Sequence, residues 1–319
     1  MPQFGYKLMS EEHGPRELIR NAQRAERLGF EFVAISDHYF PWVEAQGHSP
    51  FAWSVLGAIA SSTERVGIAT GVTCPTVRYH PAIVAQAAAT VAAVSEGRFS
   101  LGLGSGELLN EHVVGPRWPA VGVRQKMLAE AAEIIRMLFD GETHSFRGEY
   151  FELEEARLYD RPEAPPPILI AAGGGQAAAL AAEKGDGLYT TEPKKQLIEA
   201  YREAGGEGPL YAEVALCYAA DEEEAHRTLE RVYRWGAFDW EVLPELRDPK
   251  AFESASRSVR AEDLASKISA GPDVERHVEA IREYVDAGFD HVALVAIGPD
   301  QDAFFGFWEK ELRSRLESL

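Results

Sequence analysis

An acid, an imidazole and an indole lie close together near the start of the chain. The stretch Phe32 to Ile35 is wholly apolar and is followed by Asp37, His38 and Trp42. A buried strand that ends in charged and aromatic residues is typical of active sites in α/β enzymes. His38 can exchange protons near neutral pH, and Trp42 can form a wall of a pocket. Two simpler interpretations stay open, a turn-forming Asp37 and a structural, hydrogen-bonded His38.

A second candidate acid follows another apolar run. Residues 98–103 predict a strand, and the glycines of 102–106 lead directly into Glu107. They lack the G-x-G-x-x-G spacing of a dinucleotide loop, so they indicate either a tight strand exit or a binding surface. Partial burial there would raise the pKa of Glu107 and suit it to acid–base catalysis, whereas an exposed Glu107 would be a cap. Glu11 is also acidic, but its sequence context is that of an ordinary acid near a helix start.

Composition excludes several classes of function. The chain has 51 acidic and 32 basic residues, a formal net charge of -19, which disfavours nucleic acid and anionic membranes as partners. Cys74 and Cys217 are the only cysteines and lie far apart, so the sequence predicts neither a disulfide framework nor a metal site. The N-terminus has no secretory signal, and no run reaches the roughly 18 apolar residues of a membrane span. We therefore expect a cytoplasmic protein.

Predicted strands and helices alternate along the chain. Eight such units indicate a (β/α)8 barrel, because a doubly wound sheet usually has roughly five to seven strands and a dinucleotide fingerprint. An internal repeat supports this, since residues 25–35 and 284–294 both carry a helix that ends in Gly-Phe before a strand. The predicted strands are residues 4–8, 32–35, 66–72, 98–103, 168–171, 187–190, 211–218 and 291–296.

We expect one barrel domain over residues 1–319, without a linker. A Tyr- and Phe-rich stretch at about 142–167 predicts a hairpin-like decoration that ends in three consecutive prolines. Residues 235–262 contain two tryptophans and two prolines but no clean period. This segment is therefore predicted to be an irregular insertion, and its position late in the chain suits a role at the substrate mouth.

In a barrel, the residues that follow the strands share one rim, where active sites lie. This rule groups side chains from distant parts of the chain. The glycines 173–175 also open a predicted helix, so their N–H groups either bind a phosphate or a polarised ring edge, or form a plain turn. The rim residues selected in this way are Glu11, Asp37, His38, Trp42, Thr73, Cys74, Ser105, Glu107, Asn110, Gly173, Gly174, Gly175, Thr191 and Lys194.

Six motifs, in order along the chain, together resemble a known family. They are similar to the luciferase-like oxidoreductases that use the deazaflavin coenzyme F420, and most similar to the glucose-6-phosphate dehydrogenase group. The similarity runs from Phe4 to about Lys194 and more loosely through the last strand. It implies a luciferase-like (β/α)8 TIM barrel, a homodimer, and a cis peptide at Gly71-Val72. The motifs are Gly5-Tyr-Lys, Ser36-Asp-His with Pro41-Trp42, Pro75-Thr-Val-Arg-Tyr-His-Pro81, Gly104-Ser-Gly-Glu-Leu-Leu-Asn110, Ala171-Ala-Gly-Gly174 and Gly185-Asp-Gly187.

The resemblance also implies roles for individual residues. The reaction would move a hydride between a substrate C–H and ring carbon 5 of the deazaflavin. His38 would be the base or proton relay, and Glu107 would exchange a proton with the reduced ring, but which of the two takes the substrate proton stays open. Trp42 would hold the developing carbonyl, and Glu11 would be an auxiliary acid. The implied coenzyme contacts are Asp37, Val72, Cys74 (a threonine in the family pattern), Ser105, Gly106, Asn110, Gly173, Gly174, Gln176 and Ala177.

The sequence departs from the family pattern where a sugar phosphate would bind. Glucose-6-phosphate members hold the phosphate with two lysines and an arginine, because a dianion needs several converging cations. Thr191 and Lys194 match the first part of this pattern, Lys267 matches only after a shift, and no arginine lies between residues 286 and 303. We therefore expect a sugar or alcohol substrate that need not be phosphorylated.

Two other functions are compatible with the same motifs. One is a monooxygenase of the same superfamily that uses flavin mononucleotide. The other is a non-catalytic barrel that stores or delivers the deazaflavin. Coenzyme preference would distinguish the first, because a ligand that binds only the folded protein raises its thermal stability. Turnover that does not depend on His38 and Glu107 would favour the second.

Overall fold

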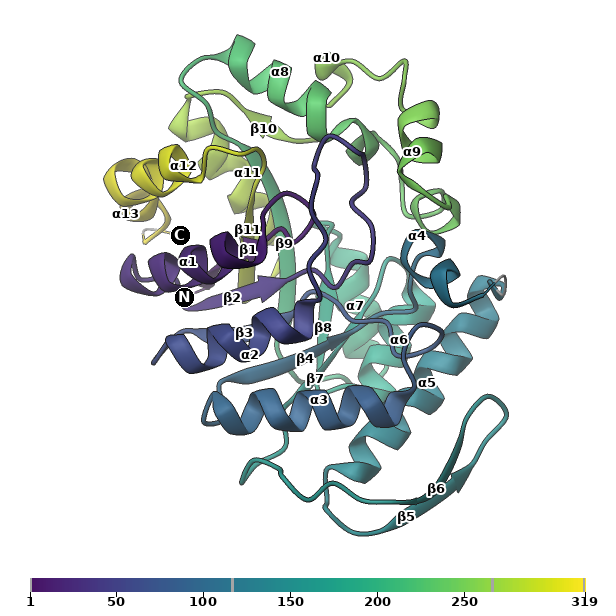
Figure 1. Ribbon diagram of the computed structural model, residues 1–319. Coiled ribbons are helices and arrows are strands. Elements are labelled where there is room, and N and C mark those ends of the chain that lie inside the picture. Colours follow the sequence, from purple (N-terminus) through teal and green to yellow (C-terminus); the bar gives the residue numbers. More distant parts are fainter. Residues whose placement is uncertain (1, 116–117, 265–266, 318) are drawn as a thin grey trace.

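Eight parallel strands form a closed barrel at the centre of the protein (Figure 1). The computed structural model describes residues 2–115, 118–264, 267–317 and 319. Each strand pairs with the next around the barrel, and the pairings β8–β9 and β11–β1 close it. The predicted (β/α)8 fold is thereby confirmed. The strands are β1 (Gln3–Leu8), β2 (Phe32–Ile35), β3 (Gly67–Thr70), β4 (Phe99–Leu103), β7 (Ile168–Ala171), β8 (Gly187–Thr190), β9 (Leu210–Cys217) and β11 (His291–Ala296).

Helices cover the outside of the barrel, and local sequence explains where several of them begin. Two start with a proline in the first turn, where its missing N–H costs nothing. Three others are capped by an aspartate, Asp221, Asp273 or Asp300, whose side chain accepts a backbone N–H of the first turn. The helices are α1 (Pro15–Arg27), α2 (Ala52–Ser62), α3 (Pro81–Val94), α5 (Val121–Leu138), α6 (Gly175–Lys184), α7 (Lys195–Glu203), α8 (Glu222–Val232), α11 (Val274–Ala287), α12 (Gln301–Phe307) and α13 (Arg313–Leu316), with a π-helical turn at Trp308–Leu312.

The side chains of each strand alternate between two apolar cores. Along β2, Val33 and Ile35 pack outward against the helices, whereas Phe32 and Ala34 point into the barrel. Successive side chains of a strand lie on opposite faces, so alternate residues of β2 belong to the outer core and to the barrel interior. The inward-facing apolar side chains pack against one another inside the barrel, and in this fold ligands bind at the C-terminal rim.

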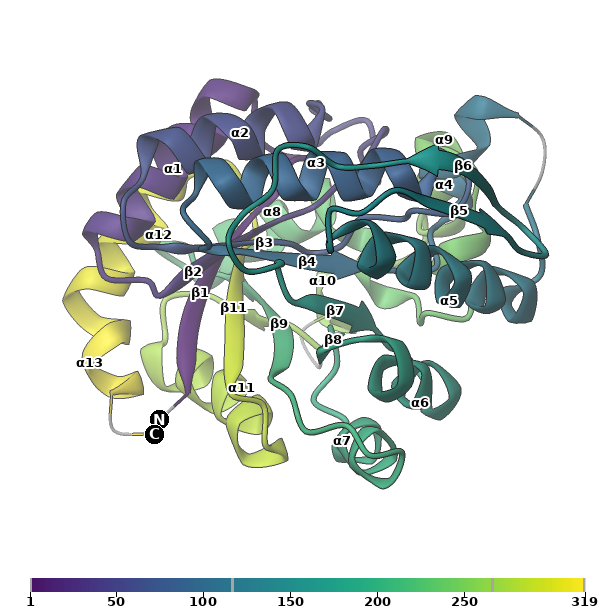
Figure 2. The ribbon, with the colours of Figure 1, turned by 90° about the horizontal axis from the view of Figure 1, so that it is seen from below.

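Two segments interrupt the alternation. Strands β5 (His144–Arg147) and β6 (Glu152–Ala156) form an antiparallel hairpin beside α3 and α5 (Figure 2). Residues 235–262, predicted to be irregular, instead contain short helices, each of at most seven residues and therefore too short to show a period. These are η2 (Arg234–Ala237), η3 (Leu243–Glu245), α9 (Pro249–Ala255) and α10 (Ala261–Leu264), followed by a short added strand, β10 (Ser269–Ala270), on β9.

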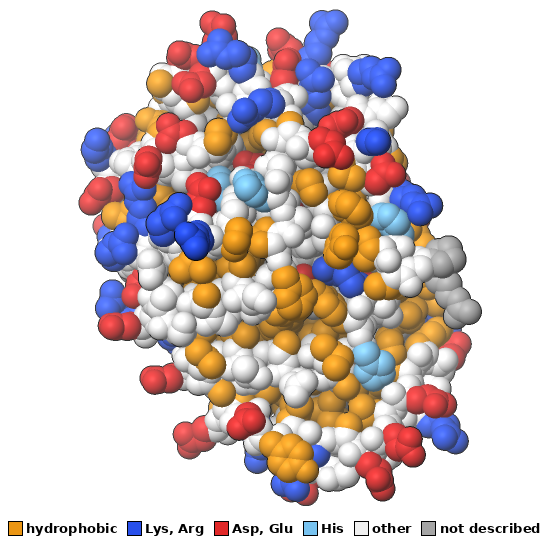
Figure 3. Space-filling view, in the orientation of Figure 1, with side chains coloured by type: hydrophobic (Ala, Val, Ile, Leu, Met, Phe, Trp, Pro, Cys, Tyr) orange, Lys and Arg blue, Asp and Glu red, His pale blue; other side chains and the backbone are white. Residues whose placement is uncertain are grey.

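The loop 36–51 and the segment 235–262 lie side by side at the C-terminal end of the barrel (Figure 1). Trp42 of the loop stacks on Trp235 and meets the edge of Phe252. On the face shown in Figure 3, apolar side chains gather along the middle, and charged side chains lie mainly around the outline. The two ends of the chain lie close together in both ribbon views. Within the described residues, no helix is both long and apolar enough to cross a membrane.

Candidate active site

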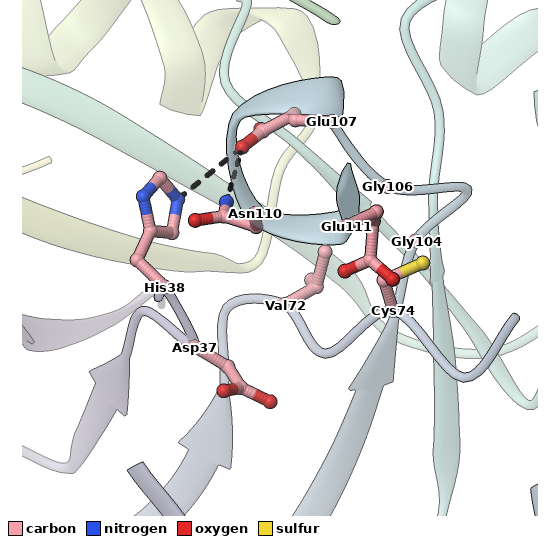
Figure 4. A pocket seen from close by; sticks show the side chains of 9 residues that line it. All are labelled: Asp37, His38, Val72, Cys74, Gly104, Gly106, Glu107, Asn110 and Glu111. Atoms are coloured by element: carbon pink, nitrogen blue, oxygen red, sulfur yellow. Dashed lines mark hydrogen bonds and ion pairs between the residues drawn. The ribbon is translucent and has the colours of Figure 1, made fainter. Parts of the chain in front are cut away.

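A pocket lies at the C-terminal rim, where β2, β3 and β4 end (Figure 4). The loop after β2 contributes two side chains, and the segment after β3 contributes two. Strand β4 leads into the short helix α4 (Leu108–Glu111), whose N-cap Glu107 and last two residues line the pocket. Most of these residues were predicted, although Glu111 was not. The pocket is lined by Asp37, His38, Val72, Cys74, Gly104, Gly106, Glu107, Asn110 and Glu111.

His38 lies between two carboxylates. Its Nε2 is 3.4 Å from Glu107 Oε2, and its Nδ1 is 3.3 Å from Glu11 Oε1. Nδ1 is also 3.2 Å from the carbonyl oxygen of Phe40. Both partners of Nδ1 are hydrogen-bond acceptors, and Nε2 faces the carboxyl group of Glu107. The structure thus brings together the three residues predicted to handle protons.

Glu107 is held at the mouth by its neighbour one helical turn away. Asn110 Nδ2 donates to Glu107 Oε2 at 3.0 Å, while Asn110 Oδ1 accepts the backbone N–H of Tyr39 at 2.9 Å. Asn110 therefore ties α4 to the loop that carries His38 (Figure 4). Burial raises the pKa of Glu107, as expected for a strand exit; the nearby imidazole of His38 opposes this shift.

Glu11 is a buried carboxylate rather than an exposed helix acid. It is 1 % exposed, and Ser36 Oγ donates to its Oε2 at 2.6 Å. Ser10 Oγ in turn donates to the carbonyl of Ser36 at 2.9 Å. These hydroxyls keep Glu11 beneath Nδ1 of His38, so the acid can fix the tautomer and orientation of the imidazole.

Trp42 forms an aromatic wall beside His38. The two ring centroids are 4.9 Å apart, and Trp42 stacks on Trp235 at 4.2 Å. The indole belongs to an apolar cluster that joins the loop 36–51 to α4, η3 and α9. Trp42 does not line the small pocket itself, so its predicted role depends on a substrate that extends from the pocket toward this wall.

Asp37 has its carboxylate fully engaged by the protein. Thr73 Oγ1 donates to Oδ2 at 2.8 Å, and Arg78 Nη2 and Tyr79 OH each donate to Oδ1 at 3.1 Å. Asp37 therefore joins the end of β2 to the segment that follows β3. A coenzyme in the pocket would contact only the part of Asp37 that lines the pocket. The sequence analysis quoted Arg78 within a motif but did not identify it as the buried counter-ion.

Glu111 is a second buried acid at the same place. Its Oε2 accepts the backbone N–H of Arg78 at 2.6 Å, whereas its Oε1 has no hydrogen-bond partner among the described residues. Burial raises its pKa to about 7, and the Arg78 guanidinium limits the rise. Its position one turn after Glu107 is the sequence signal that could have identified it.

Val72 forms the floor of the pocket. The peptide bond Gly71-Val72 is cis, as the family resemblance implied. Beneath it, Lys7 Nζ donates to the Gly71 carbonyl at 2.5 Å and to Glu213 Oε1 at 2.5 Å. Tyr189 OH donates to the same carboxylate oxygen at 2.5 Å. This buried polar group inside the barrel supports the pocket floor, and sequence analysis did not find it.

The glycines after β4 are required by close packing. A Cβ on Gly104 would lie 2.6 Å from Val72 Cγ2, and one on Gly106 would lie 2.5 Å from Cys74 Sγ. Gly106 also has a positive φ of 85°. The Cys74 thiol is buried, with its Sγ 3.1 Å from Thr76 Oγ1, and Ser105 lies between the two glycines. The sequence left open whether these glycines form a tight strand exit or a binding surface. The structure shows a tight strand exit that also lines the pocket.

The N-terminus of α6 lies beyond the pocket floor. Val72 packs near Gly104 on the pocket floor. Ala171, at the end of β7, lies on the same side of Gly104 and packs against the same apolar cluster as Val72. Helix α6 has neither a side-chain cap nor an acidic residue in its first turn, so its free N–H groups suit an anion. The predicted contacts Gly173, Gly174, Gln176 and Ala177 all lie here, and the first three are exposed.

The two predicted substrate residues lie at the end of β8, outside the lining of the small pocket. Thr191 Oγ1 accepts a hydrogen bond from Trp240 Nε1 at 2.7 Å. Lys194 is exposed and forms an ion pair with Glu192 at 2.7 Å. Trp240 was not predicted as a site residue, because the segment 235–262 has no periodic pattern that would place it at the rim.

Comparisons with known proteins identify the family of the chain. The profile of the luciferase-like monooxygenase family matches residues 2–291. An F420-dependent glucose-6-phosphate dehydrogenase of Segniliparus rotundus is 38% identical, with 99% of this chain and 98% of the relative covered. One of the same name from Amycolatopsis mediterranei is 36% identical over the whole of both chains.

Solved structures give the same result. The structure of an F420-dependent secondary alcohol dehydrogenase, in complex with an F420-acetone adduct, superposes with a TM-score of 0.91. It is 30% identical, and the match covers 98% of this chain and 99% of that one. The resemblance inferred from the motifs is thereby confirmed. The chain belongs to the luciferase-like family, in the group of the F420-dependent glucose-6-phosphate dehydrogenases.

Proposed function

We propose that the protein is a coenzyme F420-dependent oxidoreductase that transfers a hydride between a sugar or alcohol C–H and carbon 5 of the deazaflavin. The observation that carries this proposal is the position of His38 between Glu11 and Glu107, facing a glycine-lined pocket at the rim. The relatives named above support the coenzyme, and the alcohol dehydrogenase structure supports the reaction class.

The residues at the rim fit a flat ring carrying an anionic arm. Gly104 and Gly106 leave the pocket floor without side chains, and Glu111, whose Oε1 is 3.6 Å from Arg78 Nε but accepts no hydrogen bond from the described residues, also lines the pocket. The bare N-terminus of α6, beginning at Gly174, suits a phosphate. In this proposal the ring contacts are Asp37, Val72, Cys74, Ser105, Gly106 and Asn110, and the contacts to the anionic arm are Gly173, Gly174, Gln176 and Ala177.

The proton chemistry follows from the hydrogen bonds of His38. When bound, the deazaflavin supplies a two-electron hydride acceptor. His38 Nε2 would take the hydroxyl proton of the alcohol, because Nδ1 faces two acceptors, the Glu11 carboxylate and the Phe40 carbonyl. Burial raises the pKa of Glu107, which favours its protonated form, and this residue would exchange a proton with the deazaflavin ring. Trp42 borders the carbonyl that forms.

The direct test is anaerobic mixing of the purified protein with oxidised coenzyme F420 and a panel of sugars and alcohols. We expect the absorbance of the oxidised deazaflavin to fall with at least one substrate, because hydride transfer removes the ring conjugation. The control is the same mixture with an F420-dependent dehydrogenase of known substrate. No bleaching with any substrate, while the control reacts, contradicts the proposal.

Thermal unfolding distinguishes the coenzymes. A ligand that binds only the folded state raises the midpoint, so coenzyme F420 should raise it and flavin mononucleotide should not. A larger shift with flavin mononucleotide would instead favour the monooxygenase. If coenzyme F420 binds tightly but turnover does not change in His38→Ala and Glu107→Gln, the protein is a coenzyme carrier.

We also propose that the protein acts in the cytoplasm as a homodimer and folds as a single domain over residues 1–319. The family resemblance supports the dimer, and the two buried, unpaired cysteines suit a reducing compartment. One apolar core runs around the whole barrel, which supports a single folding unit. Light scattering should give twice the monomer mass, and thermal unfolding should show one transition.

A further inference from the structure

Trp240 lies between the aromatic cluster beside His38 and the ends of β7 and β8, outside the lining of the small pocket. Its Nε1 donates to Thr191 Oγ1 at 2.7 Å, and its side chain packs against the aromatic cluster that contains Trp42. Its Cβ is also only 3.7 Å from the place where a Cβ of Gly173 would be. One indole therefore connects the wall beside His38 to the ends of β7 and β8.

The hydrogen bond of Trp240 is flanked by two ion pairs. On the β8 side, Lys194 Nζ is 2.7 Å from Glu192 Oε1. On the other side, Lys267 Nζ is 3.0 Å from Asp239 Oδ1 and donates to the Ala237 carbonyl at 3.0 Å. Each lysine thus already has a carboxylate, and the four side chains sum to zero charge.

This arrangement is unsuited to a phosphorylated substrate. A phosphate dianion is bound where several uncompensated cations converge, and here it would approach two carboxylates together with two ammonium groups. The Thr191 hydroxyl accepts a hydrogen bond from Trp240 Nε1 and keeps its own O–H, so it is one neutral donor beside two lysines that are already paired. The surface that remains for a substrate, between His38 and Trp240, is aromatic and apolar.

We propose that Trp240 determines the specificity of this site, by closing it to sugar phosphates and limiting it to compact, uncharged alcohols. This inference rests on the proposed function, since it names the substrate class of the same reaction. The alcohol loses a hydride to the coenzyme and a proton to His38 Nε2, and leaves as the ketone or aldehyde. Trp240 would contact the part of a substrate that extends from the pocket past Trp42, and it takes no part in proton transfer.

The experiment measures kcat/KM for deazaflavin reduction by the full-length protein with isopropanol, cyclohexanol, glucose and glucose 6-phosphate. For the unmodified protein, we expect kcat/KM for glucose 6-phosphate to be about 100-fold or more below that for isopropanol, because the desolvated phosphate finds no free cation. In Trp240→Ala, the ratio of cyclohexanol to isopropanol should rise about tenfold, because space opens where the indole lay.

Three further variants test whether the effect comes from the size of the Trp240 side chain, from the charges beside it, or from a general disturbance of the segment 235–262. Trp240→Phe keeps the ring but loses the bond to Thr191, and should keep the alcohol ratio within about threefold. Trp118→Ala removes another indole that contacts the same segment, through Glu245, and should leave the ratio unchanged. In the Trp240→Ala background, Glu192→Gln with Asp239→Asn should free both lysines and raise turnover of glucose 6-phosphate.

The outcomes separate this inference from the proposed function. If no substrate bleaches the bound coenzyme, the proposed function fails. If glucose 6-phosphate is used as well as isopropanol or better, the proposed function stands and the specificity inference is overturned. An unchanged alcohol ratio in Trp240→Ala, in a variant whose unfolding midpoint matches that of Trp240→Phe, also overturns it.

Discussion

At the scale of single residues, His38 is the group whose removal should affect chemistry most. We predict that His38→Ala lowers kcat by about 100-fold to 10,000-fold, the usual contribution of a positioned proton-transfer group, while coenzyme affinity stays within several-fold. Steady-state kinetics and a deazaflavin titration measure the two quantities. His226→Ala, on the outer helix α8, is the control and should behave like the unmodified protein. An unchanged kcat in His38→Ala would remove His38 from the mechanism.

Lys7 is the second residue with a specific expectation, because it is the buried cation beneath the pocket floor. Lys7→Met leaves Glu213 charged and unpaired, so the free energy of unfolding should fall by about 3–5 kcal/mol. Coenzyme affinity should fall too, because the Gly71 carbonyl loses its donor. Urea unfolding and a coenzyme titration measure these effects.

The double variant Lys7→Met with Glu213→Gln separates the two consequences. It removes the unpaired charge, so most of the lost stability should return. The Gly71 carbonyl still lacks its donor, so coenzyme affinity should stay low. Full recovery of affinity in the double variant would show that Lys7 acts only through charge balance and not through the pocket floor.

At the scale of elements, the turn from β4 into α4 positions the pocket. Gly106→Ala places a methyl at a positive φ and within 2.5 Å of Cys74 Sγ, so it should both destabilise the protein and weaken coenzyme binding. Gly97→Ala is the matched control, because its φ of 83° is similar but its Cβ meets open space. Both variants should lose about 1–2 kcal/mol of stability from the backbone alone. Equal coenzyme affinity in the two variants would show that the turn does not shape the site.

At the scale of the whole molecule, the buried Glu111 should make stability depend on pH. Its pKa in the folded protein is about 7, above the 4.5 of an exposed glutamate. Its contribution therefore favours folding below about pH 4.5 and is lost as the pH rises through about 7, an effect of about 3 kcal/mol at most. Glu111→Gln cannot titrate, so its stability relative to the unmodified protein should increase over that range. Thermal unfolding from pH 5 to 8 measures this difference, and parallel pH profiles would contradict the assignment.

The sequence by itself determined the architecture and the centre of the site. The alternation of apolar runs and helical periods is local, so it revealed eight β/α units, and the position of Asp37, His38 and Glu107 after strands placed them on one rim. The sequence could not show which side chains meet, because barrel closure decides that. Lys7 and Glu213 are 206 residues apart and Thr191 and Trp240 are 49 apart, yet each pair is hydrogen-bonded. Only the tertiary structure therefore revealed the buried support of the pocket floor and the indole that joins the aromatic wall to the end of β8, because both depend on contacts between residues far apart in the sequence.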